Sequence, residues 1–182
     1  MSDSPVGGGA PCGPLGWMLD PMTTDQAVRI VSSLLTGRWC ASEQAATDEL
    51  HRLGFTFRPE PARQLTAGSV LHDLTPAPGI DHAGFTTLDG EPAGIVFFIA
   101  SSMDARNPVT NEAYQSLLAA LTQSLGPAER VWPDEDTPIR WRTTDLDVGL
   151  QLFDRRDSSV MVSVEHRARS EVAESRAHQS TT

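Results

Sequence analysis

The sequence predicts an α+β domain, in which a mostly antiparallel sheet of six to seven strands has its helices packed on one face, in the order ααβββαββββ. Apolar residues recur at helical spacing near the N-terminus and again in the middle of the chain, and strand-like apolar runs lie between and after these helices. Parallel pairing would need a crossover between most strands, and only one helix lies between strands, so antiparallel pairing is expected.

Capping signals predict the bounds of two N-terminal helices. Thr23 and Gln26 have the spacing of a capping box, which predicts a helix over residues 24–36. Ser42 is a suitable N-cap for a second helix over residues 43–53. A glycine follows each of these segments and favours its termination there.

Three strands are predicted between these helices and a third one, at residues 70–74, 84–88 and 94–100. The last of them is apolar on both faces, which favours a central place in the sheet. The third helix should run over residues 108–125, because it opens with proline at a tolerated first-turn position and is followed by Gly-Pro.

The rest of the domain is predicted to be a meander of four strands, at residues 130–132, 139–142, 148–152 and 160–164. Apolar and polar residues alternate along the last two, which indicates strands with one buried face.

The length of 182 residues suits one domain with a core and loose ends. Residues 1–16 are rich in Gly, Pro and Ser and are expected to be a disordered leader before a single domain at 17–166. Residues 167–182 are rich in Arg, Glu, Ser and Ala, and we expect a frayed helix followed by a disordered tail.

Charge and cysteine content limit the partners and the compartment. The chain has 14 basic and 24 acidic residues and a net charge of −10. Nucleic acid and anionic membranes both need clustered cations, so neither is an expected partner. No stretch approaches the ~20 apolar residues of a membrane span, and no signal-peptide pattern is present. Two cysteines without metal spacing, Cys12 and Cys40, suit a reducing cytoplasm, which is the expected location.

Residues with catalytic or metal-binding chemistry are sparse. His72-Asp73 and Asp81-His82 lie on segments that could converge, but neighbouring residues of a strand point to opposite faces, so neither pair can ligate one ion together. Cys40 follows a helix in a manner more typical of a packed cysteine than of a nucleophile. We therefore expect no metal, no cofactor and no enzymatic activity.

The strongest candidate for function is the strand Arg140-Trp141-Arg142 with its acidic flanks. In a strand, Trp141 faces one way and both arginines face the other. Either Trp141 packs beneath the third helix while the arginines are solvated or pair with Asp145 and Asp147, or the segment belongs to an exposed contact surface rich in hot-spot residue types. The second interpretation assigns partner contact to Asp134, Glu135, Asp136, Arg140, Trp141, Arg142, Asp145 and Asp147.

The segment from Leu121 to Glu165 carries a further pattern. It contains Leu-x-x-x-Leu-Gly-Pro-x-x-Arg, an acidic loop with proline, Ile-Arg-Trp-Arg, and an alternating hairpin that ends Val-x-Val-Glu. This pattern resembles a family of small uncharacterised actinobacterial proteins, and it is similar to immunity proteins that accompany polymorphic toxins. The resemblance implies a cytoplasmic protein that neutralises a toxin by occupying its active site. An acidic inhibitor would suit a toxin with a basic cleft, because opposite charges speed association.

Two other hypotheses stay open. The element order also resembles the α-βββ-α-ββ layout of small secretion chaperones, which implies an adaptor that holds a client protein, with the extra N-terminal helix as a departure. An enzyme with an unfamiliar site would draw on His72, Asp73, His82 and Cys40. The sequence leaves open whether the protein is a monomer or a homodimer.

Overall fold

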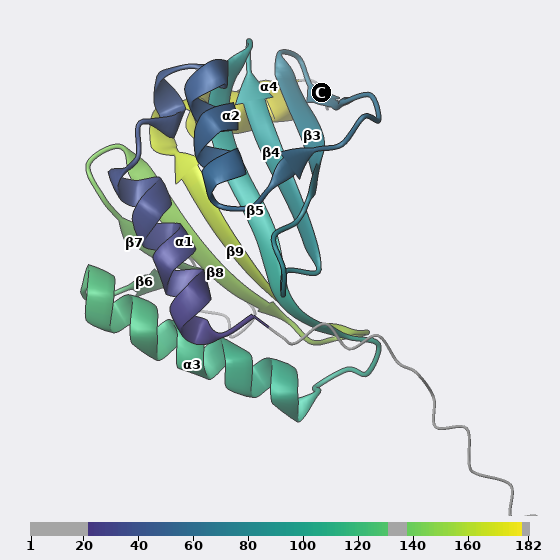
Figure 1. Cartoon of the computed structure of the whole chain (residues 1–182), viewed down its shortest axis with the longest axis vertical. Helices are drawn as coiled ribbons and strands as arrows, with labels where there is room; N and C mark the ends of the chain where they lie inside the picture. The colour runs from purple at the N-terminus through teal and green to yellow at the C-terminus, as the bar shows by residue number, and fades with distance from the viewer. Residues whose placement is uncertain (1–21, 131–137, 180–182) are drawn as a thin grey trace, which may run out of the picture.

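The computed structural model describes residues 22–130 and 138–179, and these residues form one nine-stranded sheet with helices packed against it (Figure 1). Within them, the helices are α1 (Thr24–Thr36), the short 3-10 helix η1 (Trp39–Ala41), α2 (Glu43–Arg52), α3 (Pro108–Leu125) and α4 (Arg167–Gln179). The strands are β1 (Thr56–Phe57), β2 (Arg63–Thr66), β3 (Ser69–Thr75), β4 (His82–Leu88), β5 (Glu91–Ser102), β6 (Glu129–Arg130), β7 (Ile139–Arg142), β8 (Leu146–Phe153) and β9 (Ser158–His166).

The sheet consists of two antiparallel meanders joined side by side. The strand order is β1-β3-β4-β5-β9-β8-β7-β6, and β2 pairs with β3 beside this path. After β5 the chain crosses the sheet through α3 to the far edge, and β6 to β9 then return until β9 pairs with β5. All the pairings are antiparallel, as the sequence predicted.

Local signals set the helix ends where the sequence placed them. Thr23 accepts a hydrogen bond from the Gln26 amide and the Gln26 side chain accepts one from the Thr23 amide, which completes the predicted capping box of α1. Asn107 caps α3, with Pro108 in its first turn. Gly126 ends α3 with φ of 90°, a left-handed conformation that glycine adopts at no steric cost.

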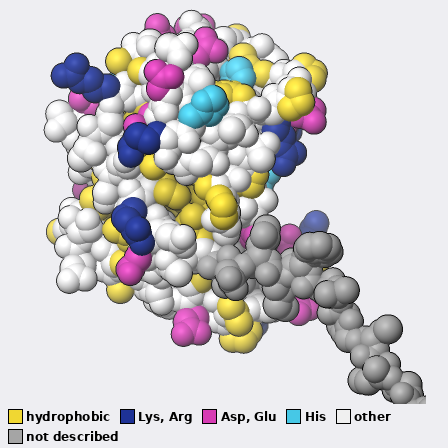
Figure 2. Space-filling view, in the orientation of Figure 1, with side chains coloured by type: hydrophobic (Ala, Val, Ile, Leu, Met, Phe, Trp, Pro, Cys, Tyr) yellow, Lys and Arg dark blue, Asp and Glu magenta, His cyan; other side chains and the backbone are white. Residues whose placement is uncertain are grey.

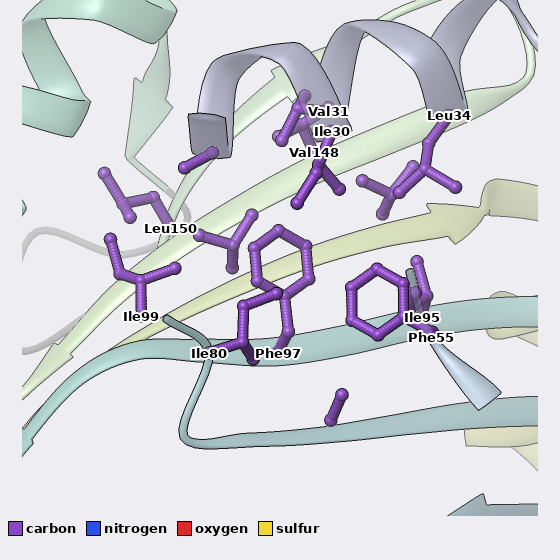
Figure 3. Close-up of a cluster of buried hydrophobic side chains, with 14 of the residues drawn as sticks. Ile30, Val31, Leu34, Phe55, Ile80, Ile95, Phe97, Ile99, Val148 and Leu150 are labelled. Atoms are coloured by element: carbon purple, nitrogen blue, oxygen red, sulfur yellow. The ribbon is translucent and has the colours of Figure 1, made fainter. Parts of the chain in front are cut away.

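The core lies between the sheet and the helices α1, α2 and α3 (Figure 3). Ile30, Val31 and Leu34 of α1 point toward Phe97 of β5 and toward the inner side chains of β8. Phe97 is fully buried, so β5 is central both in the sheet order and in the core, as its apolar run predicted.

The structure adds two features to the predicted order. The short strands β1 and β2 pair with β3, which gives five strands before α3 instead of three. The residues of β2 are largely exposed, so its sequence lacks the apolar alternation that identifies a strand. The segment expected to fray forms the 13-residue helix α4.

The helix α4 lies on the opposite face of the sheet from α1, α2 and α3, behind the strands in Figure 1. It faces Gly94, Val96 and Glu165 across a shared cavity, and these residues alternate along their strands with the core residues Ile95 and Val164. Across residues 22–130 and 138–179, no helix combines the length and the apolar composition that a membrane crossing requires.

Candidate functional site

The face of the sheet turned away from α1, α2 and α3 is the candidate functional site, and we call it the open face. Strand alternation defines it, because every second side chain of β4, β5, β7, β8 and β9 points away from the core. Along the described chain, α4 is the one helix that covers part of it. Outside the area beneath α4, the open face includes His82, Phe98, Arg140, Arg142, Asp147, Gly149, Gln151, Phe153, Met161 and Ser163.

Large apolar side chains form a strip across the open face. Phe98 on β5 and Met161 on β9 are register partners, and Met161 also faces Gln151 on β8. The ring centroid of Phe98 lies 6.1 Å from that of His82 and 6.4 Å from that of Phe153. Phe153 is 37% exposed, unusually accessible for a side chain this large. We call His82, Phe98, Phe153 and Met161 the aromatic strip.

The aromatic strip borders a hollow and a flat floor. A cavity of about 380 Å³ lies beside Phe98 and His82 and is lined further by Met103. The floor is a row of small residues, in which Ser163 lies directly beside Gly149. A Cβ atom at Gly149 would meet the Ser163 hydroxyl oxygen at 2.5 Å, so the buried Ser163 side chain fills the space beside this glycine. Small residues of this kind let another molecule approach a sheet closely.

Charged residues border the other side of the open face. Asp147 is buried, and its Oδ1 accepts hydrogen bonds from Nε and Nη2 of Arg167 at 2.9 and 2.8 Å. Arg140 Nη1 lies 3.7 Å from Asp147 Oδ2. Arg142 Nε lies 3.5 Å from Glu129 Oε2, and both of these side chains are more than half exposed. The border therefore carries both signs of charge, with its arginines oriented by carboxylates.

The structure separates the residues that the sequence grouped as a contact surface. Arg140, Arg142 and Asp147 lie on the open face, as the alternation predicted. Trp141 points into the core, where it is 2% exposed and its Nε1 donates to the Gly126 carbonyl at 3.1 Å. The alternative in which Trp141 packs against the third helix is therefore the observed arrangement.

Asp145 is a further acidic member of the group. Asp145 is exposed in the turn between β7 and β8, and its carbonyl accepts a hydrogen bond from the Arg167 amide at 2.9 Å. Asp134, Glu135 and Asp136 lie outside the described residues.

Sequence reasoning missed the arginines of α4 and the aromatic strip. Arg169 donates to the carbonyl oxygens of Cys40 and Pro92, and Arg176 donates to both carboxylate oxygens of Asp89. The hydrogen bonds from Arg176 hold the pKa of the Asp89 carboxyl below its ordinary value. No local signal foretells such contacts, because the partners are far apart in sequence. The strip had a signal, since Phe98 is the outward member of an apolar run.

The candidate catalytic groups do not share one face. His72 pairs in register with Phe85, a core residue, and its ring lies 6.0 Å from that of Phe85. His82 belongs to the aromatic strip on the other side of the sheet. Asp73 forms an ion pair with Arg63 at 3.2 Å. Among the residues that the structure describes, no three His, Cys, Asp or Glu side chains gather as metal ligands would.

The thiol of Cys40 is held in its neutral form. It lies half-buried beside the core, and burial raises its pKa to about 12 despite the opposing effect of Arg169. A nucleophilic cysteine needs a lowered pKa, so this thiol is poorly suited to attack a substrate at neutral pH.

The helical side of the molecule offers a contrast to the open face. Figure 2 shows the side that carries α1 and α2, on which acidic and arginine side chains are scattered among polar ones, with a few hydrophobic groups between them.

Comparison with known proteins gives one match. Residues 25–166 match the model of a family of unknown function, DUF6301, and this range extends from α1 to the end of β9. No curated protein and no solved structure matches the chain. The helix α4 begins at Arg167, directly after the matched range.

Proposed function

We propose that this chain, which belongs to the DUF6301 family, is a non-catalytic immunity protein that neutralises a toxin protein by binding it through the open face. The observation that carries this proposal is the aromatic strip. Phe98, Phe153 and Met161 project from central and neighbouring strands without a helix of the described chain over them. Aromatic residues and Met are enriched where proteins bind one another.

The border of the open face supports the same function. Arginine is a common hot-spot residue, and Arg140 and Arg142 lie at the charged border of the same face, already paired with carboxylates. An arginine held in place by a carboxylate loses less side-chain entropy when a partner arrives. Apolar anchors with a charged rim are the arrangement found in specific protein interfaces.

The net charge of the chain indicates the kind of toxin. At −10, the field of the protein would attract a cationic partner and raise its association rate. Toxins that act on nucleic acid need basic clefts for their substrate. An acidic inhibitor in the same cytoplasm is suited to close such a cleft.

The test begins with the gene beside this one. We expect it to encode a toxin whose growth arrest is relieved when this chain is expressed with it, and whose purified catalytic domain binds this chain. Phe153→Asp should weaken that binding by about tenfold or more, because a buried interface anchor is typically worth 2 kcal/mol or more. Arg142→Glu should weaken it at the charged border.

Val109→Asp is the matched control, because Val109 is an exposed apolar residue on α3, at 66% exposure. It should leave the affinity unchanged. Thermal unfolding of each variant separates lost binding from lost folding. The proposal fails if no toxin is encoded nearby and none binds, or if Val109→Asp and Phe153→Asp weaken binding equally.

The alternative is a secretion chaperone that holds a client segment against the same strip. An extended apolar segment of a client protein would also fit against the aromatic strip, and this favours the second function. Light scattering separates the two, since the chaperone hypothesis expects a homodimer with a bound client, whereas the immunity hypothesis expects one chain for each toxin.

A further inference from the structure

The helix α4 is attached to the open face without a hydrophobic core of its own. None of its residues is buried, and its largest apolar side chain, Val172, is 42% exposed. Most helices in proteins are stabilised by packing an apolar stripe. This helix lacks such a stripe, so something else holds it.

Three arginines provide the attachment. Arg167 binds Asp147, Arg169 lies 3.4 Å from Glu91, and Arg176 makes two hydrogen bonds to Asp89 at 2.9 and 2.8 Å. The acceptors lie on β8, in the turn after β4 and at the start of β5, so the helix crosses the end of the open face. Arg169 and Arg176 also donate to main-chain carbonyls, those of Pro92 and Ala67 among them.

The contact between α4 and the sheet is incompletely filled. A cavity of about 240 Å³ lies between them, lined on the helix by Ser170 and Ala173 and on the sheet by Gly94, Thr86 and Val96. The helix faces this cavity with the small residues Ser170 and Ala173 and with Glu174, and the two small residues leave part of the sheet surface without van der Waals contact. A helix with larger apolar side chains at these two positions would fit better.

We infer that the surface beneath α4 is a docking site for an arginine-bearing helix of the partner protein, and that α4 occupies it in the free protein. The partner helix has arginines that reach Asp89 and Glu91, and apolar side chains where α4 has Ser170 and Ala173. The inference rests on the proposed function, whose partner segment it names. Charge complementarity supports it, because α4 itself shows arginine side chains bound to these acceptors.

The surface is continuous with the rest of the open face. Val96 lies beneath the cavity and on the same strand as Phe98 of the aromatic strip. A partner that covers the strip therefore reaches the α4 site on the same face.

The experiment uses two full-length variants that both loosen α4. Arg169→Ala with Arg176→Ala removes the donors of α4 and keeps the acceptors of the sheet. Asp89→Asn with Glu91→Gln removes the acceptor charges. The probe is a synthetic peptide with the sequence of residues 167–179, in which Ser170→Leu and Ala173→Leu fill the cavity. Hydrogen exchange of α4 checks that it is loosened in each variant.

We expect the arginine variant to bind the peptide more tightly than the parent chain, by up to about fivefold for each ion pair removed. An exposed ion pair is worth up to a factor of about five, and affinity rises with the fraction of chains in which the site is vacant. The acceptor variant should not bind the peptide, although its α4 is also loosened. Arg52→Ala on α2, whose ion pair with Glu49 is remote from α4, should behave as the parent chain does.

Three results would overturn the inference. If both double variants bind the peptide equally, the peptide adheres to any exposed sheet surface. If the arginine variant does not bind the peptide although its α4 is released, the site does not recognise a helix. An α4 that stays protected in both variants would show that these arginines do not hold it. The proposed function has a separate outcome, because toxin binding that is unaffected by Asp89→Asn and Glu91→Gln keeps the function and removes only this site.

Discussion

Replacement of Trp141 tests how the strand β7 divides its side chains between core and open face. Trp141 is 2% exposed, and its indole Nε1 donates to the Gly126 carbonyl at 3.1 Å, which ties the end of α3 to the sheet. Trp141→Phe loses this hydrogen bond, which is worth about 1 kcal/mol. It also leaves a small cavity, because the phenyl ring is smaller than the indole ring. We expect it to lower the free energy of unfolding by about 2 kcal/mol.

The neighbouring positions supply the comparison. Trp141→Ala should cost about 3–5 kcal/mol, as for other large buried aromatics. Arg142 is 53% exposed in an ion pair with Glu129, so Arg142→Ala should cost at most about 0.5 kcal/mol. Urea denaturation followed by circular dichroism measures all three. A cost for Trp141→Ala no larger than that for Arg142→Ala would refute the burial of Trp141 and the assignment of the open face.

Further substitutions and a pH series test the sheet floor, the division of faces and Cys40. Gly149→Ala places a Cβ 2.5 Å from the Ser163 hydroxyl oxygen and should destabilise the protein by about 0.5–1.5 kcal/mol, whereas Ser163→Ala in the same chain should recover most of this loss in urea denaturation. Phe97→Ala in the core should lower the free energy of unfolding by about 3–5 kcal/mol. Phe153→Ala should lower it by less than about 1 kcal/mol, because Phe153 is 37% exposed. Similar losses for the two variants in urea denaturation would contradict the division of faces. In a Cys12→Ser background, Cys40 should be alkylated very slowly at pH 8. Its pKa of about 12, compared with an ordinary 9.0, leaves about a thousandfold less thiolate at that pH. An alkylation rate that reaches a plateau near pH 9.0 would refute the raised pKa. Because the folded pKa is the higher one, the contribution of Cys40 to stability is full below pH 9.0 and is lost as the pH rises toward 12.

Elements with signals inside a few residues were predictable from the sequence. The capping box of Thr23 and Gln26 and the Gly126-Pro127 stop depend only on local backbone geometry, and both helices have the predicted bounds. The alternation of Arg140, Trp141 and Arg142 was also predictable, because successive side chains of any strand point to opposite faces.

Features that depend on distant partners were not predictable in the same way. The two-residue strand β1 exists because it pairs with β3, and two residues are too short for a pattern. The helix α4 has no apolar periodicity, and it is positioned by arginines whose acceptors, such as Asp89, lie far away in the sequence. The predicted contact surface combined residues from both faces of the sheet. Trp141 lies on the core face, where it is buried on the side of the sheet that α3 covers.

Hydroxyl-radical footprinting of the purified chain, alone and bound to the toxin proposed as its partner, tests the open face as the binding surface most directly. Phe98, Phe153 and Met161 belong to side-chain types that label readily, and they form the strip at the centre of the proposed contact. We predict that the complex protects Met161 and Phe153 and leaves Val109 on α3 labelled as in the free protein. Protection of Val109 with unchanged labelling of Met161 and Phe153 would contradict the account.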